Sequence, residues 1–137
     1  MNTIIILTTI NAPLATVWEC WTNPLHVKNW NYAVADWHCP EAINNLTIGG
    51  EFHYTMAAKD NSMSFDFWGT YQNIVIEKYI DIVLGDGRKM NVSFEQMDTG
   101  AIVTEQFEPE QVNPIERQQA GWQMILDNFK NYVEQSI

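Results

Sequence analysis

The chain has 137 residues, of which 46% are hydrophobic and 12% aromatic, and this composition excludes a disordered protein. Seventeen acidic residues against seven basic ones give a formal net charge of −10, which opposes binding to nucleic acid or to anionic lipid. We therefore expect no nucleic-acid partner, whereas a small neutral, apolar or cationic ligand is compatible with this charge.

Targeting and redox signals are sparse. The apolar run at residues 4–7 is far too short to span a bilayer, and no charged segment precedes it as in a signal peptide. The two cysteines, Cys20 and Cys39, are too few for a disulfide framework. We expect one domain over residues 1–137, in a cytoplasmic protein that does not insert into a membrane.

The first third of the chain predicts one strand and two helices. Residues 3–10 are rich in β-branched side chains and indicate a strand. Pro13 then suits the first turn of a helix, and Pro24 ends that helix and begins a short second one, which ends near Trp30. Helical spacing in the first helix produces an apolar stripe of Leu14, Val17, Trp18 and Trp21.

After residue 30 the apolar pattern changes to period two, which predicts antiparallel strands. The predicted inward-facing residues are Phe52, Tyr54 and Met56; Phe65, Phe67, Gly69 and Tyr71; Ile80, Ile82 and Leu84; Met90, Val92 and Phe94; and Val103, Glu105 and Phe107. Turn signals at residues 60–61, 85–87 and 98–100 separate these runs. Consecutive hairpins indicate a meander with one buried face.

The chain ends in its longest predicted helix. Asn113 is a candidate N-cap, Pro114 suits the first helical position, and Glu116 stands where the acid of a capping box belongs. The apolar stripe of this helix consists of Ile115, Trp122, Ile125, Phe129, Tyr132 and Val133. Because a single sheet must cover its apolar face, we expect the helix to pack against it.

Several short motifs occur in an order that is typical of a known family. They are Ala12-Pro13 with Val17-Trp18 and Trp21-Thr22, Trp30, Gly49-Gly50-Glu51-Phe52, Gly69-Thr70-Tyr71, Val92-Ser93-Phe94-Glu95, and Gly121-Trp122 with Ile125-Leu126 and Phe129. Over residues 3–134 the chain resembles the C-terminal-domain family of the heat-shock-protein-90 ATPase activator homologues. That family lies within the START-like (SRPBCC, polyketide cyclase, Bet v-like) superfamily.

The resemblance implies an α+β helix-grip fold. In such a fold a curved antiparallel sheet of about seven strands surrounds the long C-terminal helix, and two short helices follow the first strand. The resemblance also implies a cavity for an apolar ligand between sheet and helix. It matches only one domain of the chaperone activator, so we do not expect a chaperone partner.

Aromatic and methionine side chains dominate the predicted inner face, and we take them as candidate ligand contacts together with one carboxylate. The candidates are Trp30, Trp37, Phe52, Tyr54, Met56, Phe65, Phe67, Tyr71, Met90, Glu105, Trp122 and Phe129. Tyr54, Tyr71 and Glu105 would orient the ligand. The alternative is a filled core, because pockets and cores are lined by the same residue types.

Glu105 is the most informative of these residues, since strand alternation places its carboxylate on the inner face. A buried carboxylate without a partner has a raised pKa and could serve as an acid, a base or a ligand anchor. Two alternatives stay open. The register could be shifted by one residue, which would bring Ile102 and Thr104 inside. Arg88 or Arg117 could pair with Glu105 and make it purely structural.

Metal and nucleophile chemistry find little support in the sequence. His38 and Cys39 are adjacent in a predicted extended segment, so their side chains point to opposite faces and cannot easily share a metal. His26 and His53 have no ligand spacing either, so we expect no metal and no cofactor. A nucleophilic Cys39 stays open, although free cysteines are more often inert and buried. His38 is a candidate polar group at the rim of the cavity.

Three functions are compatible with these patterns. The leading hypothesis is a binding domain for a small apolar or aromatic ligand. The second is a cofactor-free enzyme of cyclase, dehydratase or hydrolase type on the same cavity, although no catalytic motif occurs and no catalytic residue can be named. The third is a protein-interaction module or a homodimer, for which an outward-facing Trp68 is the one indication.

Overall fold

The computed structural model describes residues 3–136, which form seven strands and three helices. In chain order these are β1 (Ile4–Ile10), α1 (Leu14–Thr22), α2 (Pro24–Val27), β2 (Trp37–Asn44), β3 (Glu51–Ala58), β4 (Ser64–Val75), β5 (Tyr79–Leu84), β6 (Lys89–Met97), β7 (Gly100–Phe107) and α3 (Ile115–Gln135). The element order confirms the expected helix-grip arrangement. Helix α2 ends at Val27, before the Trp30 that the sequence indicated.

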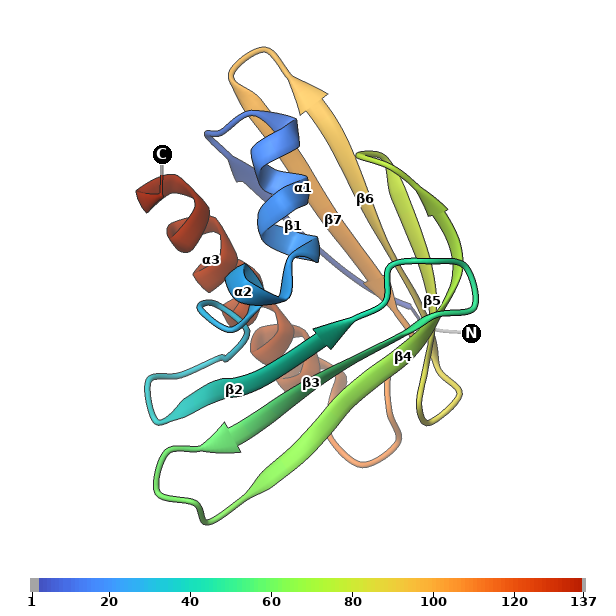
Figure 1. Ribbon diagram of the computed structural model, residues 1–137. Coiled ribbons are helices and arrows are strands. Elements are labelled where there is room, and N and C mark those ends of the chain that lie inside the picture. Colours follow the sequence, from blue (N-terminus) through green and yellow to red (C-terminus); the bar gives the residue numbers. More distant parts are fainter. Residues whose placement is uncertain (1–2, 137) are drawn as a thin grey trace.

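All neighbouring strands are antiparallel, and their order across the sheet is β1-β7-β6-β5-β4-β3-β2. The sheet curls into a half-barrel, and α3 lies across its concave side (Figure 1). The first strand pairs with the last, with Ile4 opposite Phe107 and Ile10 opposite Ala101. As a result, the two ends of the sheet-forming segment meet beside α3, which packs along β1.

Burial alternates along β7 as the period-two pattern requires. Ala101, Val103, Glu105 and Phe107 are buried, whereas Ile102 and Thr104 are only half-buried on the other face. The alternative with a one-residue shift is therefore wrong. A shift of that kind would have turned every side chain of the strand to the opposite face.

Strand β2 is the element that the sequence pattern does not reveal. Its register against β3 shifts between His38 and Glu41, close to Pro40, and its burial alternates only after this shift, from Glu41 to Asn44. A bulge removes the period of two on which strand prediction depends, because two residues then oppose one on the partner strand. Pro40 also lacks the backbone N–H of a regular ladder.

The start of α3 differs from the predicted capping box. Pro114 precedes Ile115 at the N-cap position, and no side chain caps the helix. The Asn113 side chain instead donates to Glu110 Oε2 at 3.1 Å. The buried amide of Gln118 does not cap the helix but ties the preceding loop to it, because its Nε2 donates to the carbonyl oxygens of Asn113 at 2.7 Å and Glu110 at 3.1 Å, and its Oε1 accepts from the Glu110 N–H at 2.9 Å. A side chain five to eight residues further along the chain therefore fixes the loop before α3.

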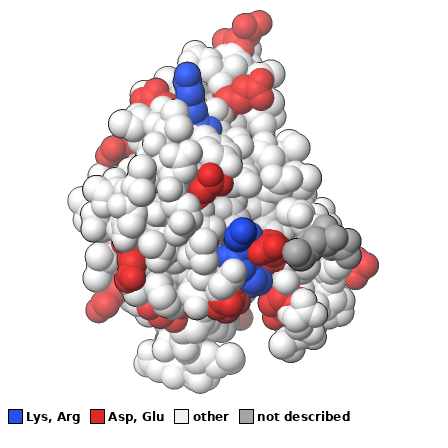
Figure 2. Space-filling view, turned by 90° about the vertical axis from the view of Figure 1, so that its right-hand side faces the viewer, with Lys and Arg blue, Asp and Glu red and all other residues white. Residues whose placement is uncertain are grey.

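The surface agrees with the strongly acidic composition. Acidic side chains are scattered over the face seen in Figure 2, with few basic ones among them. Within residues 3–136, no helix has the length and hydropathy needed to cross a membrane.

Candidate functional site

A cavity of about 280 Å³ lies between the concave face of the sheet and α3. Its walls are mostly aromatic and aliphatic. The segment from α1 to the loop after α2 contributes Trp21, Trp30 and Asn31, and β3 and β4 contribute Phe52, Tyr54, Met56, Phe65, Phe67 and Tyr71. From β5, β6 and the turn between them come Ile82, Arg88, Met90 and Val92. The last strand, β7, contributes Glu105, and α3 contributes Trp122, Ile125 and Leu126. This volume is near the lower end for small-molecule sites.

Most of the ligand contacts proposed from the sequence line this cavity. They are Trp30, Phe52, Tyr54, Met56, Phe65, Phe67, Tyr71, Met90, Glu105 and Trp122. Two of the proposed contacts do not line it. Trp37 is half-buried on β2, where its ring lies 6.0 Å from that of Phe65. Phe129 is fully buried behind the wall, with its ring 4.9 Å from Trp21 and 4.7 Å from Trp30.

Several lining residues were not among the proposed contacts. They are Trp21, Asn31, Ile82, Arg88, Val92, Ile125 and Leu126. Ile82 and Val92 carry the same period-two signal as the proposed residues, so alternation alone could have found them. Asn31 and Arg88 lie in irregular segments, where no periodicity indicates the direction of a side chain.

Aromatic contacts build the walls around Phe52. Its ring centroid lies 4.8 Å from that of Tyr54, 5.5 Å from Phe67 and 5.7 Å from Tyr71. Gly69 makes room for this cluster, because a Cβ atom there would lie 2.8 Å from Ile82 Cγ2 and 3.0 Å from Phe52 Cε2. The glycine within the predicted inner face therefore serves close packing of the cavity wall.

Glu105 is the one carboxylate that lines the cavity among the described residues. It is 6% exposed, and its neighbours across the ladder are Ile6 of β1 and Val92 of β6. No described residue forms a hydrogen bond or an ion pair with its side chain. Burial in these apolar surroundings raises the pKa of Glu105 to about 8. The carboxyl group is therefore mostly protonated at neutral pH.

The arginines named as partners for Glu105 are engaged elsewhere or exposed. Arg88 Nε donates to Asp86 Oδ2 at 2.7 Å, and its Nη1 donates to the carbonyl oxygen of Glu108 at 3.2 Å. Arg117 is exposed on α3. The alternative of a structural Arg–Glu105 pair is therefore wrong, and the positive charge that lines the cavity is already neutralised by Asp86.

Three other polar side chains line the cavity. The Tyr71 hydroxyl donates to Asn44 Oδ1 at 2.6 Å, and burial raises the pKa of Tyr71 to about 12. Burial and the neighbouring Tyr71 hydroxyl raise the pKa of Tyr54 well above its ordinary value. Asn31 Nδ2 is buried and has no hydrogen-bond partner within residues 3–136. These groups are all neutral at physiological pH, so they can orient a ligand without adding charge.

The cysteines do not have the surroundings of a nucleophile. Cys39 is buried, and burial raises the pKa of its thiol to about 11. Burial also raises the pKa of Cys20. Because the thiolate is the reactive form, both cysteines are inert at neutral pH. His38 is half-buried on β2 and does not line the cavity.

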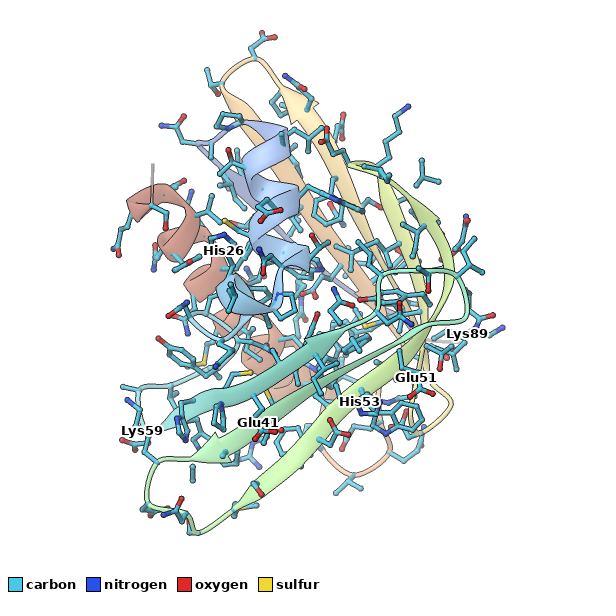
Figure 3. All side chains as sticks on the ribbon, viewed as in Figure 1. His26, Glu41, Glu51, His53, Lys59 and Lys89 are labelled. Atoms are coloured by element: carbon cyan, nitrogen blue, oxygen red, sulfur yellow. The ribbon has the colours of Figure 1, made fainter. Side chains whose placement is uncertain are left out.

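Trp68 points away from the cavity, as predicted, but its indole already stacks against another side chain. His53 stacks on it with ring centroids 5.3 Å apart and an interplanar angle of 7°. His53 Nδ1 lies 2.7 Å from Asp66 Oδ2, and its Nε2 lies 2.8 Å from Glu51 Oε1, on the outer face of β3 and β4 (Figure 3). Trp68 is half-buried by these contacts, which weakens it as an indication of a docking surface.

Comparisons with known proteins agree on one family. A family model described as Activator of Hsp90 ATPase homolog 1-like protein matches residues 11–134. The solution structure of an AHSA1-like protein from Aeromonas hydrophila is 40% identical, with a TM-score of 0.93, and the match covers 98% of this chain and 94% of that one. A protein from Cytophaga hutchinsonii is 43% identical, with a TM-score of 0.85 and coverage of 99% and 94%.

More distant structures share the fold alone. A protein from Chromobacterium violaceum superimposes with a TM-score of 0.86 at 21% identity, over 98% of this chain and 99% of that one. No curated protein matches the sequence.

Proposed function

The chain belongs to the family of Activator of Hsp90 ATPase homolog 1-like proteins, and on this premise we propose that it binds a small, mostly apolar molecule between its sheet and α3. The observation that carries the proposal is that the aromatic side chains between these elements leave a cavity of about 280 Å³. A protein interior is normally packed to the density of an organic crystal. An apolar space of this size is therefore costly unless a ligand fills it.

Binding would depend mainly on the burial of apolar surface. Each Å² removed from water contributes about 25 cal/mol, and the aromatic walls exclude water from the ligand. Phe65 lines the cavity and is 52% exposed, and Trp122 on the opposite side is half-buried. We place the entrance between these two residues.

A cofactor-free enzyme on the same cavity is the second candidate, favoured by one observation. Glu105 is a buried carboxylic acid whose pKa of about 8 suits proton transfer near neutral pH. Acid–base chemistry generally needs a second group with a matched pKa. Among the described residues, the other titratable groups that line the cavity are Tyr54 and Tyr71, whose pKa values are both raised above the ordinary value, and Arg88, which is paired with Asp86. Ligand binding is therefore the better-supported function.

Native mass spectrometry of the freshly purified protein tests the binding proposal. We expect a discrete excess mass that disappears on denaturation, because a ligand that fills an apolar cavity is retained through purification. Absence of excess mass, together with no thermal shift across a panel of small aromatic compounds, would contradict the proposal.

A pair of variants on α3 makes this test specific to the cavity. Ile125→Trp places a bulky ring in the cavity and should abolish both the excess mass and the thermal shifts. The adjacent Met124 is 41% exposed and does not line the cavity, so Met124→Trp should preserve both. Equal behaviour of the two variants would place the binding site elsewhere.

A further inference from the structure

The inner wall of the cavity contains an acid group that nothing in the described chain satisfies. Glu105 lies on β7 between Ile6 of β1 and Val92 of β6 and lines the cavity, and no residue within 3–136 forms a hydrogen bond or an ion pair with its side chain. A polar group that has no partner in the protein takes its hydrogen bonds from whatever occupies the space that it faces. For Glu105 that space is the cavity, so a ligand bound there is in a position to supply the partner.

The groups that face the cavity determine the protonation state of this acid. The titratable or charged side chains lining it, within residues 3–136, are Tyr54 on β3, Tyr71 on β4, Arg88 in the turn between β5 and β6, and Glu105 itself. The two tyrosines are neutral, and the charge of Arg88 is paired with Asp86 at 2.7 Å. No facing cation stabilises the carboxylate, so the neutral acid, which carries an O–H donor, is favoured at neutral pH.

We propose that the cavity takes a small aromatic or apolar molecule with a neutral hydrogen-bond acceptor, such as a carbonyl oxygen, which receives a hydrogen bond from the carboxyl group of Glu105. This inference rests on the proposed function of the cavity as a binding site. A neutral donor in an apolar pocket fixes the orientation of the ligand and requires no charge to be buried.

An ammonium ligand is the competing chemistry, since aromatic walls and a carboxylate can also hold a cation. Binding an ammonium would bury two charges, and the desolvation of both opposes the gain from their attraction. It would also require Glu105 to lose its proton. The two ligand types therefore predict opposite dependences of affinity on the ionisation of Glu105.

Three probes of matched shape separate these possibilities. Acetophenone has a carbonyl acceptor, α-methylstyrene has a methylene group in place of the oxygen, and α-methylbenzylamine has an ammonium group. Dissociation constants are measured from two-dimensional N–H NMR titrations of the intact chain at about pH 6.5 and about pH 9.5, which bracket the pKa of Glu105. We expect acetophenone to bind about 3- to 10-fold more tightly than α-methylstyrene at the lower pH. That preference should vanish at the higher pH, where the carboxyl group has lost its donor proton.

Two substitutions test the role of the side chain itself. Glu105→Gln keeps an N–H donor, so the preference for acetophenone should persist and become independent of pH. Glu105→Leu removes the hydrogen bond, so acetophenone should fall to the affinity of α-methylstyrene while α-methylstyrene binds at least as well as before. If the leucine variant does not give a folded NMR spectrum, the pH profile of the glutamine variant still tests the hydrogen bond. A preference for acetophenone that depends on pH in that variant would overturn the inference.

The outcomes separate this inference from the function on which it rests. Equal binding of acetophenone and α-methylstyrene to the unmodified chain would overturn the inference but leave the cavity as a binding site. If α-methylbenzylamine binds most tightly and Glu105→Gln loses this binding, the inference is wrong. The ligand class would then be a cation and not a molecule with a neutral acceptor. Failure of all three probes to bind at millimolar concentration would contradict the proposed function as well.

Discussion

Trp122 of α3 lies flat against Phe107 of β7, with ring centroids 3.8 Å apart and an interplanar angle of 14°. The same indole meets Phe67 of β4 edge-on at 5.8 Å. Phe107 is fully buried on the face of β7 that also carries Glu105, two residues away. Through this one side chain, α3 therefore contacts two distant strands of the half-barrel and closes the cavity on its helical side.

Trp122→Ala should lower the free energy of unfolding by about 2–4 kcal/mol, because it removes the stack on Phe107 and enlarges the cavity. The cost is smaller than for a fully buried tryptophan, since Trp122 is half-buried. Urea denaturation measures the change. Trp122→Phe keeps a ring on Phe107 and should recover most of the loss. Unchanged stability of the alanine variant would show that the stack does not anchor α3.

Glu105→Gln should change how stability depends on pH. Burial raises the pKa of Glu105 from 4.5 to about 8, so between these values the folded state holds a proton that the unfolded state has lost. The free energy of unfolding should therefore fall as pH rises through this window, by about 3–5 kcal/mol in total.

The glutamine variant lacks this titration and should gain stability relative to the unmodified chain as pH rises from about 5 to about 9. Thermal or urea unfolding across that range measures the difference. A constant difference at all pH values would mean that Glu105 keeps an ordinary pKa in the folded protein, contrary to its buried, unpartnered position.

Gly69→Ala should destabilise the protein by about 1–3 kcal/mol through overpacking. The added Cβ would lie 3.0 Å from the backbone carbonyl oxygen of Val83 and 2.8 Å from Ile82 Cγ2, and the backbone atom cannot move without disturbing the β4–β5 ladder.

Gly121 provides the matched control, because a Cβ there meets no atom within 4 Å apart from its chain neighbours and the backbone of its own helix. Gly121→Ala should stabilise α3 by about 0.5–1 kcal/mol through helix propensity. Differential scanning calorimetry of both variants compares them directly. If both alanine variants shift the melting temperature in the same direction, crowding at residue 69 does not determine the change in stability of Gly69→Ala.

The regular elements of this fold could be predicted from the sequence because each follows one physical period. Alternation placed Glu105 inside, and the glycine at residue 87, with a φ of 92°, marked the β5–β6 hairpin. Irregular elements could not be predicted in this way. The bulge in β2 interrupts its period, and the loop before α3 depends on Gln118, whose hydrogen bonds to Glu110 span eight residues.

The candidate site was predictable to the extent that it coincides with the inner face of the sheet. Ile125 lines the cavity and Phe129 does not, although both belong to the apolar stripe of α3. A small rotation of α3 about its axis would exchange them, and the spacing of apolar residues does not define that rotation. Asn31 lies in a loop, so its side chain had no predictable direction. Whether a space remains at all depends on how side chains pack, and composition carries no information about that.

His53 should contribute stability that is present at low pH and lost at high pH. Hydrogen bonds to Asp66 first, and then to Glu51, raise the pKa of His53. A histidine with a raised pKa stabilises the fold below its unfolded value of 6.5, and this contribution disappears as pH rises through the folded value. His53→Gln should thus reduce the free energy of unfolding at about pH 5.5 by less than about 1 kcal/mol, because the pairs are exposed.

The same variant should show little of this electrostatic loss at a pH above the folded pKa of His53, where the imidazole has lost its proton. NMR titration of the imidazole provides the direct measurement, and Asp66→Asn should lower the pKa of His53 by removing its nearest carboxylate, 2.7 Å away. A titration curve that is identical with and without Asp66 would contradict this account. It would also mean that stacking on Trp68, and not ion pairing, holds the histidine on the outer face of the sheet.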